Sequence, residues 1–110
     1  MKIYEVSFTP RAVADFDETL DWYRTQSTDA ANKWIIAVET MLDALERSPG
    51  QFAKARVDGA IAGVSLREYS FGAGRRRTHR AVFAIRPSKV VVYAIHDLSR
   101  RDINVEDLLG

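Results

Sequence analysis

Three apolar runs lie close together in the second half of the chain, and they restrict the fold more than any other feature. The runs cover residues 64–71, 78–85 and 90–96, and glycine- or proline-containing stretches separate them. They are rich in β-branched and aromatic residues, as is typical of strands. Successive strands with short connections pair antiparallel, so this half predicts a three-stranded antiparallel meander. The last run is apolar on both faces, which predicts a central strand.

The first half predicts a strand followed by two helices. Residues 2–8 alternate between apolar and polar side chains, which is the period of a half-buried strand. Thr9 and Pro10 are typical of a helix start, and an apolar helical stripe follows them to Tyr23. A polar break at residues 25–29 separates this helix from a second one.

The second helix has Ser27 or Thr28 as its expected cap, and it ends at Ser48-Pro49-Gly50. Two helices with a short connection pack as an antiparallel hairpin. The sequence therefore predicts an α+β fold with a single domain, residues 1–110: an N-terminal strand, an antiparallel helical hairpin and the meander. We expect the helices on one face of the sheet and the other face at least partly open to a partner.

Composition excludes several classes of function. The 110 residues include no cysteine, which excludes thiol catalysis, disulfides and thiolate metal sites. Only two histidines are present, a poor ligand set for a metal, and no nucleotide-binding glycine motif occurs, so we expect neither a metal nor a cofactor. No run approaches the roughly 20 apolar residues of a membrane span, and we expect a cytoplasmic protein that does not interact with membranes.

The net charge of +1 hides a strong asymmetry. Residues 1–50 have a net charge of −4 and residues 51–110 have a net charge of +5. Within residues 64–101, nine basic residues oppose two acidic ones. This separation predicts a basic, phosphate-facing surface on the strands. The nine basic residues are Arg67, Arg75, Arg76, Arg77, Arg80, Arg86, Lys89, Arg100 and Arg101.

The expected hairpin register gives a catalytic hypothesis. If Ile85 pairs with Val90, then His79 lies opposite His96, and Arg80 lies on the other face of the sheet. Two neighbouring histidines among arginines could move protons in phosphodiester cleavage, while the arginines hold the phosphate. The alternative is structural: each histidine caps a strand end and bonds to the backbone.

Other residues allow a functional and a structural interpretation as well. Arg75, Arg76 and Arg77 follow Gly-Ala-Gly, as either a mobile finger on a nucleic-acid backbone or a solvated loop. Tyr69 and Phe71 could stack on bases, but they fit core packing better. The remaining large aromatic residues lie at helical core spacing and are expected to pack: Trp22, Tyr23 and Trp34.

The order of these segments resembles the RelE/ParE superfamily of type II toxins, including the plasmid stabilisation proteins. The resemblance covers nearly the whole chain, and the apolar strand that runs into His96 and then into arginines is its most telling part. It is carried by TPRAVADFDETLDWY, AANKWIIAVETMLDALERSPG, LREYSF, THRAVFAI and VVVYAIHDLSRRD.

The resemblance implies an α+β toxin, a cognate antitoxin partner that masks the basic surface in a hetero-oligomer, and an essential target. RelE-like members cut mRNA on the ribosome, and ParE-like members act against DNA gyrase. By resemblance, Arg80 and Arg100 or Arg101 are phosphate-binding residues, and Arg67 lies on the strand that carries catalytic lysines. The chain lacks that lysine pair and a tyrosine after Arg101.

The sequence-based expectation is thus an RNA-cleaving toxin. Its catalytic candidates are Arg67, His79, Arg80, His96 and Arg100, and its expected nucleic-acid contacts are Arg75, Arg76, Arg77 and Arg101. The missing residues leave endoribonuclease activity open. The alternatives are a ParE-like gyrase inhibitor and a non-catalytic nucleic-acid-binding module.

Overall fold

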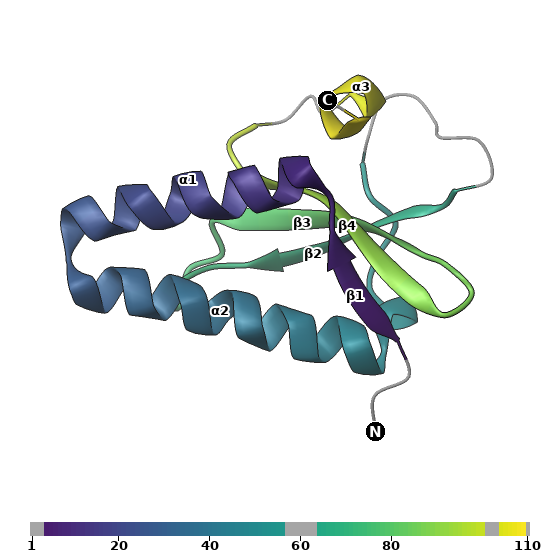
Figure 1. The fold of residues 1–110 in the computed structure, drawn as a ribbon, viewed down its shortest axis with the longest axis horizontal. Helices are drawn as coiled ribbons and strands as arrows, with labels where there is room; N and C mark the ends of the chain where they lie inside the picture. Colours follow the sequence, from purple (N-terminus) through teal and green to yellow (C-terminus); the bar gives the residue numbers. More distant parts are fainter. Residues whose placement is uncertain (1–3, 57–63, 101–103, 110) are drawn as a thin grey trace.

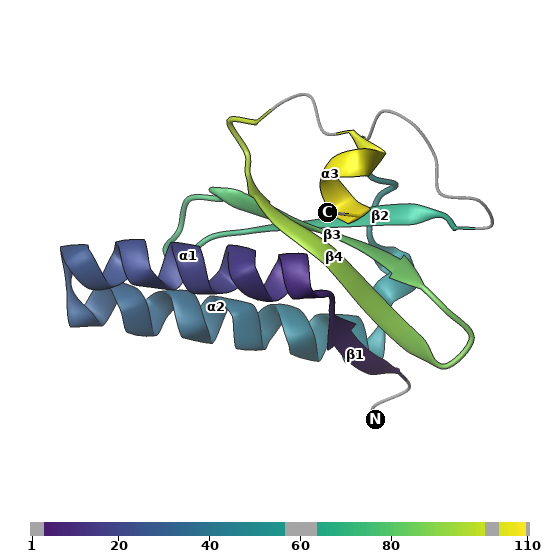
Figure 2. The same ribbon diagram turned by 45° about the horizontal axis from the view of Figure 1, so that its top comes forward.

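A computed structural model describes residues 4–56, 64–100 and 104–109. A helical hairpin lies on one face of a four-stranded sheet, and a short C-terminal helix lies on the other face (Figures 1 and 2). This arrangement confirms the predicted α+β fold, with the helices of the hairpin on one face. Within the described residues, no helix is long and apolar enough to cross a membrane.

One serine separates the two long helices. Helix α1 (Pro10–Gln26) starts at Thr9, whose hydroxyl oxygen accepts a hydrogen bond from the Ala12 amide at 3.2 Å. Ser27 ends α1 by donating its amide to the Tyr23 carbonyl. Its hydroxyl oxygen then accepts from the Ala30 amide at 3.0 Å and caps α2 (Thr28–Arg47). The break is therefore shorter than the predicted 25–29, because one residue serves both helix ends.

The sheet has the strand order β1-β4-β3-β2. As predicted, β2 (Leu66–Phe71), β3 (His79–Ile85) and β4 (Lys89–Asp97) form an antiparallel meander with β4 inside the sheet. Strand β1 (Glu5–Phe8) pairs parallel to β4, with Phe8 opposite Val92. The helical hairpin thus connects β1, at one edge of the sheet, to β2 at the other edge.

A β-bulge near Val82 and Phe83 changes the predicted hairpin register. Ile85 pairs with Val90 as expected, but Phe83 pairs with Val92 and Val82 pairs with Ala94. Tyr93 is the extra residue on β4. One inserted residue sends every later side chain to the opposite face. The prediction that His79 lies opposite His96 is therefore wrong: His96 lies opposite Arg80, and His79 lies opposite Asp97.

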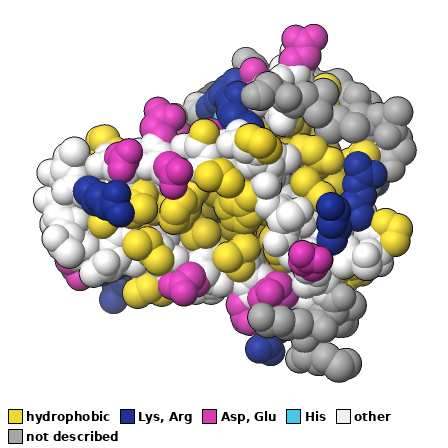
Figure 3. All heavy atoms as spheres, in the orientation of Figure 1, with side chains coloured by type: hydrophobic (Ala, Val, Ile, Leu, Met, Phe, Trp, Pro, Cys, Tyr) yellow, Lys and Arg dark blue, Asp and Glu magenta, His cyan; other side chains and the backbone are white. Residues whose placement is uncertain are grey.

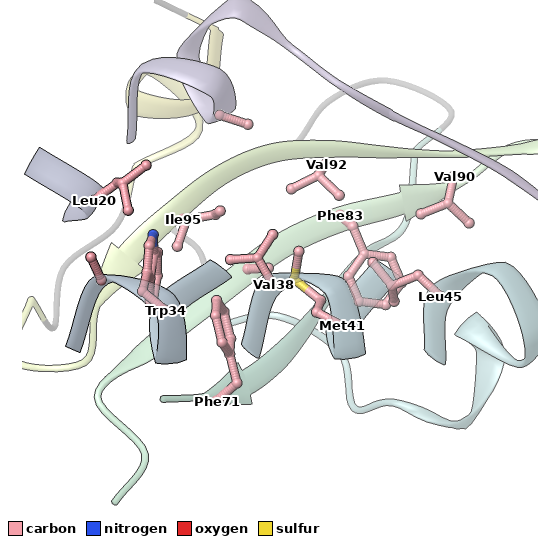
Figure 4. Close-up of a cluster of buried hydrophobic side chains, with 13 residues drawn as sticks. Leu20, Trp34, Val38, Met41, Leu45, Phe71, Phe83, Val90, Val92 and Ile95 are labelled. Carbon is pink, nitrogen blue, oxygen red and sulfur yellow. The ribbon is translucent and has the colours of Figure 1, made fainter. Parts of the chain in front are cut away.

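Two apolar clusters hold the layers together. The larger one lies between the hairpin and the sheet and is centred on Trp34, Met41 and Phe83, all fully buried (Figure 4). The smaller one lies on the other face, where Leu108 of α3 (Val105–Leu109) packs with Val82, Ala84, Tyr93 and Ala94. Helix α3 thus covers part of the face that we expected to be open. A short 3-10 turn, η1 (Pro49–Gln51), follows α2.

Candidate functional site

The basic residues of the sheet do not form one surface. Arg67 lies opposite Phe83 on the face that packs against the hairpin, and it donates to the Phe52 carbonyl at 2.6 Å. Arg80 lies on the other face, opposite Ser70 and His96. Alternation along the strands separates these two arginines. The prediction of a single phosphate-facing surface is therefore wrong for the two strand arginines, Arg67 and Arg80.

Arg80 is buried and ion-paired. Its side chain is 4% exposed, Nη1 lies 3.4 Å from Oε1 of Glu68, and Nη2 donates to the Arg100 carbonyl at 3.2 Å. Nε has no partner within the described part of the chain. Glu68 also accepts from the Arg56 amide at 3.0 Å. This geometry ties the β2, β3 and post-β4 segments together and leaves little room for a phosphate at Arg80.

His96 is a buried, neutral ring. It is 5% exposed, and burial, followed by the nearby Arg100 guanidinium, lowers its pKa below the usual 6.5. Nη1 of Arg100 lies 3.4 Å from Nδ1 of His96. Arginine carries only donors, so Nδ1 accepts in this contact and the ring proton is on Nε2. That Nε2–H has no hydrogen-bond acceptor among the described residues.

His79 lies on the hairpin side of the sheet. Its ring centroid is 4.8 Å from that of Trp34, and Nδ1 is 2.8 Å from the Thr78 hydroxyl oxygen. Burial lowers the pKa of His79 below 6.5, partly offset by the Asp97 carboxylate. Although the two histidines are on opposite faces, both reach the end of the sheet where β3 begins and β4 ends.

At this end, α1 and the sheet enclose a recess of about 520 Å³. The recess brings together three of the sequence candidates, His79, His96 and Arg100, and excludes Arg67 and Arg80. Its helical wall is a stripe of α1 residues that our sequence analysis did not treat as site residues: Asp15, Glu18, Thr19, Trp22 and Tyr23. Their spacing, on one side of two helical turns, was visible in the sequence, but nothing there indicated that this stripe meets the histidines.

Asp15 holds the helical wall against the sheet. Strand β1 ends at Phe8, so α1 rather than a strand covers the β4 edge beyond Val92. The Thr9 hydroxyl donates to the Tyr93 carbonyl at 2.9 Å, and Oδ2 of Asp15 accepts from the Ile95 amide at 2.9 Å. These contacts satisfy strand groups that would otherwise lack partners, and they fix the position of the recess.

The tri-arginine segment is an exposed loop with a closed base. Arg75, Arg76 and Arg77 are all exposed, and the Thr78 amide donates to the Phe71 carbonyl at 2.9 Å. A Cβ atom at Gly72 would collide with the Arg76 carbonyl oxygen, so only glycine permits this closure. Arg101 lies outside the described residues. No group of three or more metal-ligating side chains occurs in the described ranges.

Trp22 differs from its predicted packing role. It is 58% exposed at the recess, whereas Trp34 is fully buried and Tyr23 packs partly buried against the core. Trp22 and Tyr23 meet edge to face, with their centroids 5.0 Å apart.

A second surface feature is an apolar groove between the helices. Figure 3 shows a band of hydrophobic side chains that runs along the hairpin face of the molecule. Val13 is 45% exposed in this groove. The groove is about 300 Å³ in volume and is lined by Val6, Phe8, Val13, Phe16, Val38 and Leu42.

Comparison with known proteins places these features in context. Residues 6–102 match the model of a family described as the ParE toxin of the type II toxin–antitoxin system parDE. The chain is similar to a structure of the chromosomal ParDE toxin–antitoxin system from P. aeruginosa, with a TM-score of 0.62 and 20% identity over 86% of this chain and 96% of that one. It is also similar to the YoeB dimer from Staphylococcus aureus, with a TM-score of 0.47 and 14% identity over 84% and 93% of the two chains. No curated protein sequence gives a significant match.

Proposed function

This chain belongs to the ParE toxin family and is thus a toxin of a type II toxin–antitoxin system, and we propose that it acts by inhibiting DNA gyrase rather than by cutting mRNA. The proposal follows the ParE-like branch of the superfamily. Gyrase and the ribosome are both cytoplasmic targets, so the proposed site of action is the cytoplasm. A cognate antitoxin is implied by the family.

The burial of Arg80 is the observation that carries this proposal. The RNA-cleaving interpretation needs Arg80 to hold a phosphate, but the side chain is 4% exposed and is paired with Glu68. A phosphate bound to Arg80 would have to displace the buried Glu68 carboxylate and separate side chains that pack together on this face of the sheet. Arg67, the other strand candidate, is on the opposite face. The lysine pair and the C-terminal tyrosine of the RNA-cleaving branch have no counterpart in the sequence.

A second candidate function is ribosome-dependent mRNA cleavage through the recess. It is favoured by one observation: His79, His96 and Arg100 line the same recess. Burial lowers both histidine pKa values, so the rings are neutral near pH 7 and one of them could act as a base. If mRNA cleavage takes place in the recess, Arg100 contacts the phosphate and Arg80 only stabilises the fold.

Controlled expression in a bacterial host separates the two functions. For a gyrase inhibitor we expect double-strand breaks and an SOS response, with full-length mRNA in primer extension. Purified toxin should also inhibit supercoiling by gyrase. Codon-specific mRNA cuts without DNA damage would favour the second function, and harmless expression of folded protein would contradict both. A His96→Gln variant tests whether the recess is catalytic. If the toxin cuts mRNA through the recess, the folded variant should no longer cut mRNA.

We also propose that the apolar groove binds the antitoxin. The groove exposes aliphatic and aromatic side chains from β1 and both helices, which suits the apolar face of an amphipathic helix. The surrounding surface of the hairpin carries both signs of charge (Figure 3). An antitoxin bound in the groove would be held mainly by apolar contacts, whereas the sequence predicted an electrostatic mask.

A further inference from the structure

The recess beside α1 has two chemically different walls. The wall formed by α1 carries the carboxylates of Asp15 and Glu18 and the rings of Trp22 and Tyr23, and the wall formed by the sheet carries His79, His96, Asp97 and Arg100. Three carboxylates thus face one guanidinium. Arg100 is paired with Asp107, whose Oδ2 lies 2.7 Å from its Nη2, and Asp15 is likewise paired with Arg11 at 3.3 Å. The carboxylates of Glu18 and Asp97 have no ion pair among the described residues and would attract a cation.

Two groups in the α1 wall are available to a cation. Glu18 is exposed and has no hydrogen bond or ion pair with the described residues, whereas Asp15 is held by Arg11 at 3.3 Å and by the Ile95 amide. Trp22 lies one helical turn further along and is 58% exposed, with Tyr23 supporting it edge to face. An indole face beside a carboxylate binds ammonium and guanidinium groups through electrostatic and cation–π attraction.

The buried side of the recess contains a hydrogen-bond donor without an acceptor among the described residues. The His96 ring is buried, at 5% exposed, yet its Nε2–H group has no acceptor among the described residues. Buried donors are nearly always satisfied, so a bound molecule that supplies an acceptor would be stabilised here. A free cation cannot do so, because ammonium and guanidinium groups have only donors. The occupant must therefore carry both a positive group and a hydrogen-bond acceptor.

We propose that this recess binds an arginine or lysine residue in an extended segment of a protein partner. The basic side chain lies against Glu18 and Trp22. A turn of the His96 ring, whose Nε2 is enclosed in this structure, then lets a main-chain carbonyl oxygen of the same segment accept its N–H. The size fits, because the stripe from Asp15 to Tyr23 spans about 12 Å along α1, the length of three to four extended residues. This inference goes beyond the proposed function, and it excludes the second candidate function, which needs a phosphate in the same recess.

The chain contains its own reporters for this site. Both of its histidines line the recess, and of its two tryptophans only Trp22 is exposed, whereas Trp34 is fully buried. Histidine-ring NMR signals and quenching of the tryptophan fluorescence therefore report on the recess. The probe is the peptide acetyl-Ala-Arg-Ala-amide, and its control is the same peptide with citrulline, which has nearly the shape of arginine but no charge.

We expect saturable shifts of both histidine signals and quenching of Trp22 with the arginine peptide, and binding weaker by at least about 5-fold with citrulline. Glu18→Gln should cause a similar loss. Asp17→Asn is the matched control, because Asp17 is an exposed α1 carboxylate outside the recess, and it should bind as the unmodified protein does. Equal binding of the two peptides, or no binding, would overturn the proposal. Shifts with adenosine monophosphate but not with the arginine peptide would also overturn it, in favour of a nucleotide site.

Discussion

Arg80 shows how a basic residue on a strand can serve the fold rather than a ligand. Its pair with Glu68 is almost fully enclosed, with the two side chains 4% and 9% exposed. Arg80→Met leaves the buried Glu68 carboxylate with only the Arg56 amide and the exposed Arg56 guanidinium, whose Nε is 3.9 Å away. We therefore expect the free energy of unfolding to fall by about 3–5 kcal/mol. Urea denaturation measures this change.

The double variant Arg80→Met with Glu68→Leu is the control for this prediction. It removes both charges, so most of the lost stability should return, apart from the hydrogen bond that Glu68 accepts from the Arg56 amide. A single variant no less stable than the double variant would contradict the buried-pair interpretation. Loss of toxicity in an Arg80 variant therefore needs a stability measurement before it is assigned to function.

The two histidines predict a pH dependence of stability. Burial is the main cause that lowers both pKa values below 6.5, so the unfolded chain binds these protons more readily than the folded one. Stability should therefore be full above about pH 7 and should fall as the pH drops through 6.5 and below it. Asp97 and Asp107, with pKa values below 3.8, contribute only at lower pH.

Thermal unfolding at pH 7.5 and pH 5.5 measures this effect. The melting temperature should be lower at pH 5.5, and the difference should shrink in His79→Gln and shrink further when His96→Gln is added. A protein equally stable at both pH values would show that these rings accept protons without cost in the folded state.

At the scale of elements, the hairpin depends on Ser27. Its amide ends α1 and its hydroxyl starts α2. Ser27→Ala keeps the first role and loses the second, so we expect a loss of about 1 kcal/mol. Ser27→Asp retains a side-chain acceptor at the start of α2 and should remain close to the unmodified protein in urea denaturation. Equal stability of the alanine and aspartate variants would contradict a capping role.

The sequence predicted those elements whose signals are local. Thr9-Pro10, the helical stripes and the stop at Pro49 are local signals, and the short connections between apolar runs were enough to predict the meander. The bulge was not predictable, because the run from Val90 to Ile95 contains no glycine or proline to indicate an extra residue. That single residue moves His96 to the face of Arg80 and thereby changes the candidate site.

The recess was not predictable for a related reason. It depends on where α1 lies along β4, and this position is set by the contacts of Thr9 with Tyr93 and of Asp15 with Ile95, about 80 residues apart in the chain. Helical spacing showed that Asp15, Glu18 and Trp22 share a side of α1, but it could not show which strand end they face.

At the scale of the molecule, the charge asymmetry of the sequence does not become one basic platform among the described residues. Arg67 points toward the hairpin side, Arg80 is buried on the other face, and Arg86 and Lys89 lie at the β3–β4 turn. The exposed tri-arginine loop is a separate site of positive charge at the opposite end of β3. Dispersed charges of this kind steer encounters with a partner but do not follow a nucleic-acid backbone. A protein target fits this distribution better than a polyanion.

The apolar groove on the hairpin gives a prediction about antitoxin binding. Val13→Glu places a charge in the groove, where it would be desolvated by a docked apolar helix, so we expect binding to weaken by at least about 10-fold. Ile36→Glu is the matched control, because Ile36 is 59% exposed and does not line the groove. Co-purification with the protein of the adjacent reading frame, followed by titration calorimetry, measures both variants.

Salt concentration distinguishes this groove from an electrostatic mask. Contacts between apolar side chains are not screened, whereas attraction between exposed charges weakens as the Debye length falls from about 10 Å at 0.1 M to about 3 Å at 1 M salt. If the antitoxin docks in the groove, most of its affinity should survive 1 M salt and should disappear with Val13→Glu. If its affinity instead falls steeply with salt and both variants bind equally, the basic residues rather than the groove hold the antitoxin. The two surfaces therefore make opposite predictions for one titration. If the affinity is salt-sensitive, the exposed loop of Arg75, Arg76 and Arg77 is the first candidate for the interface.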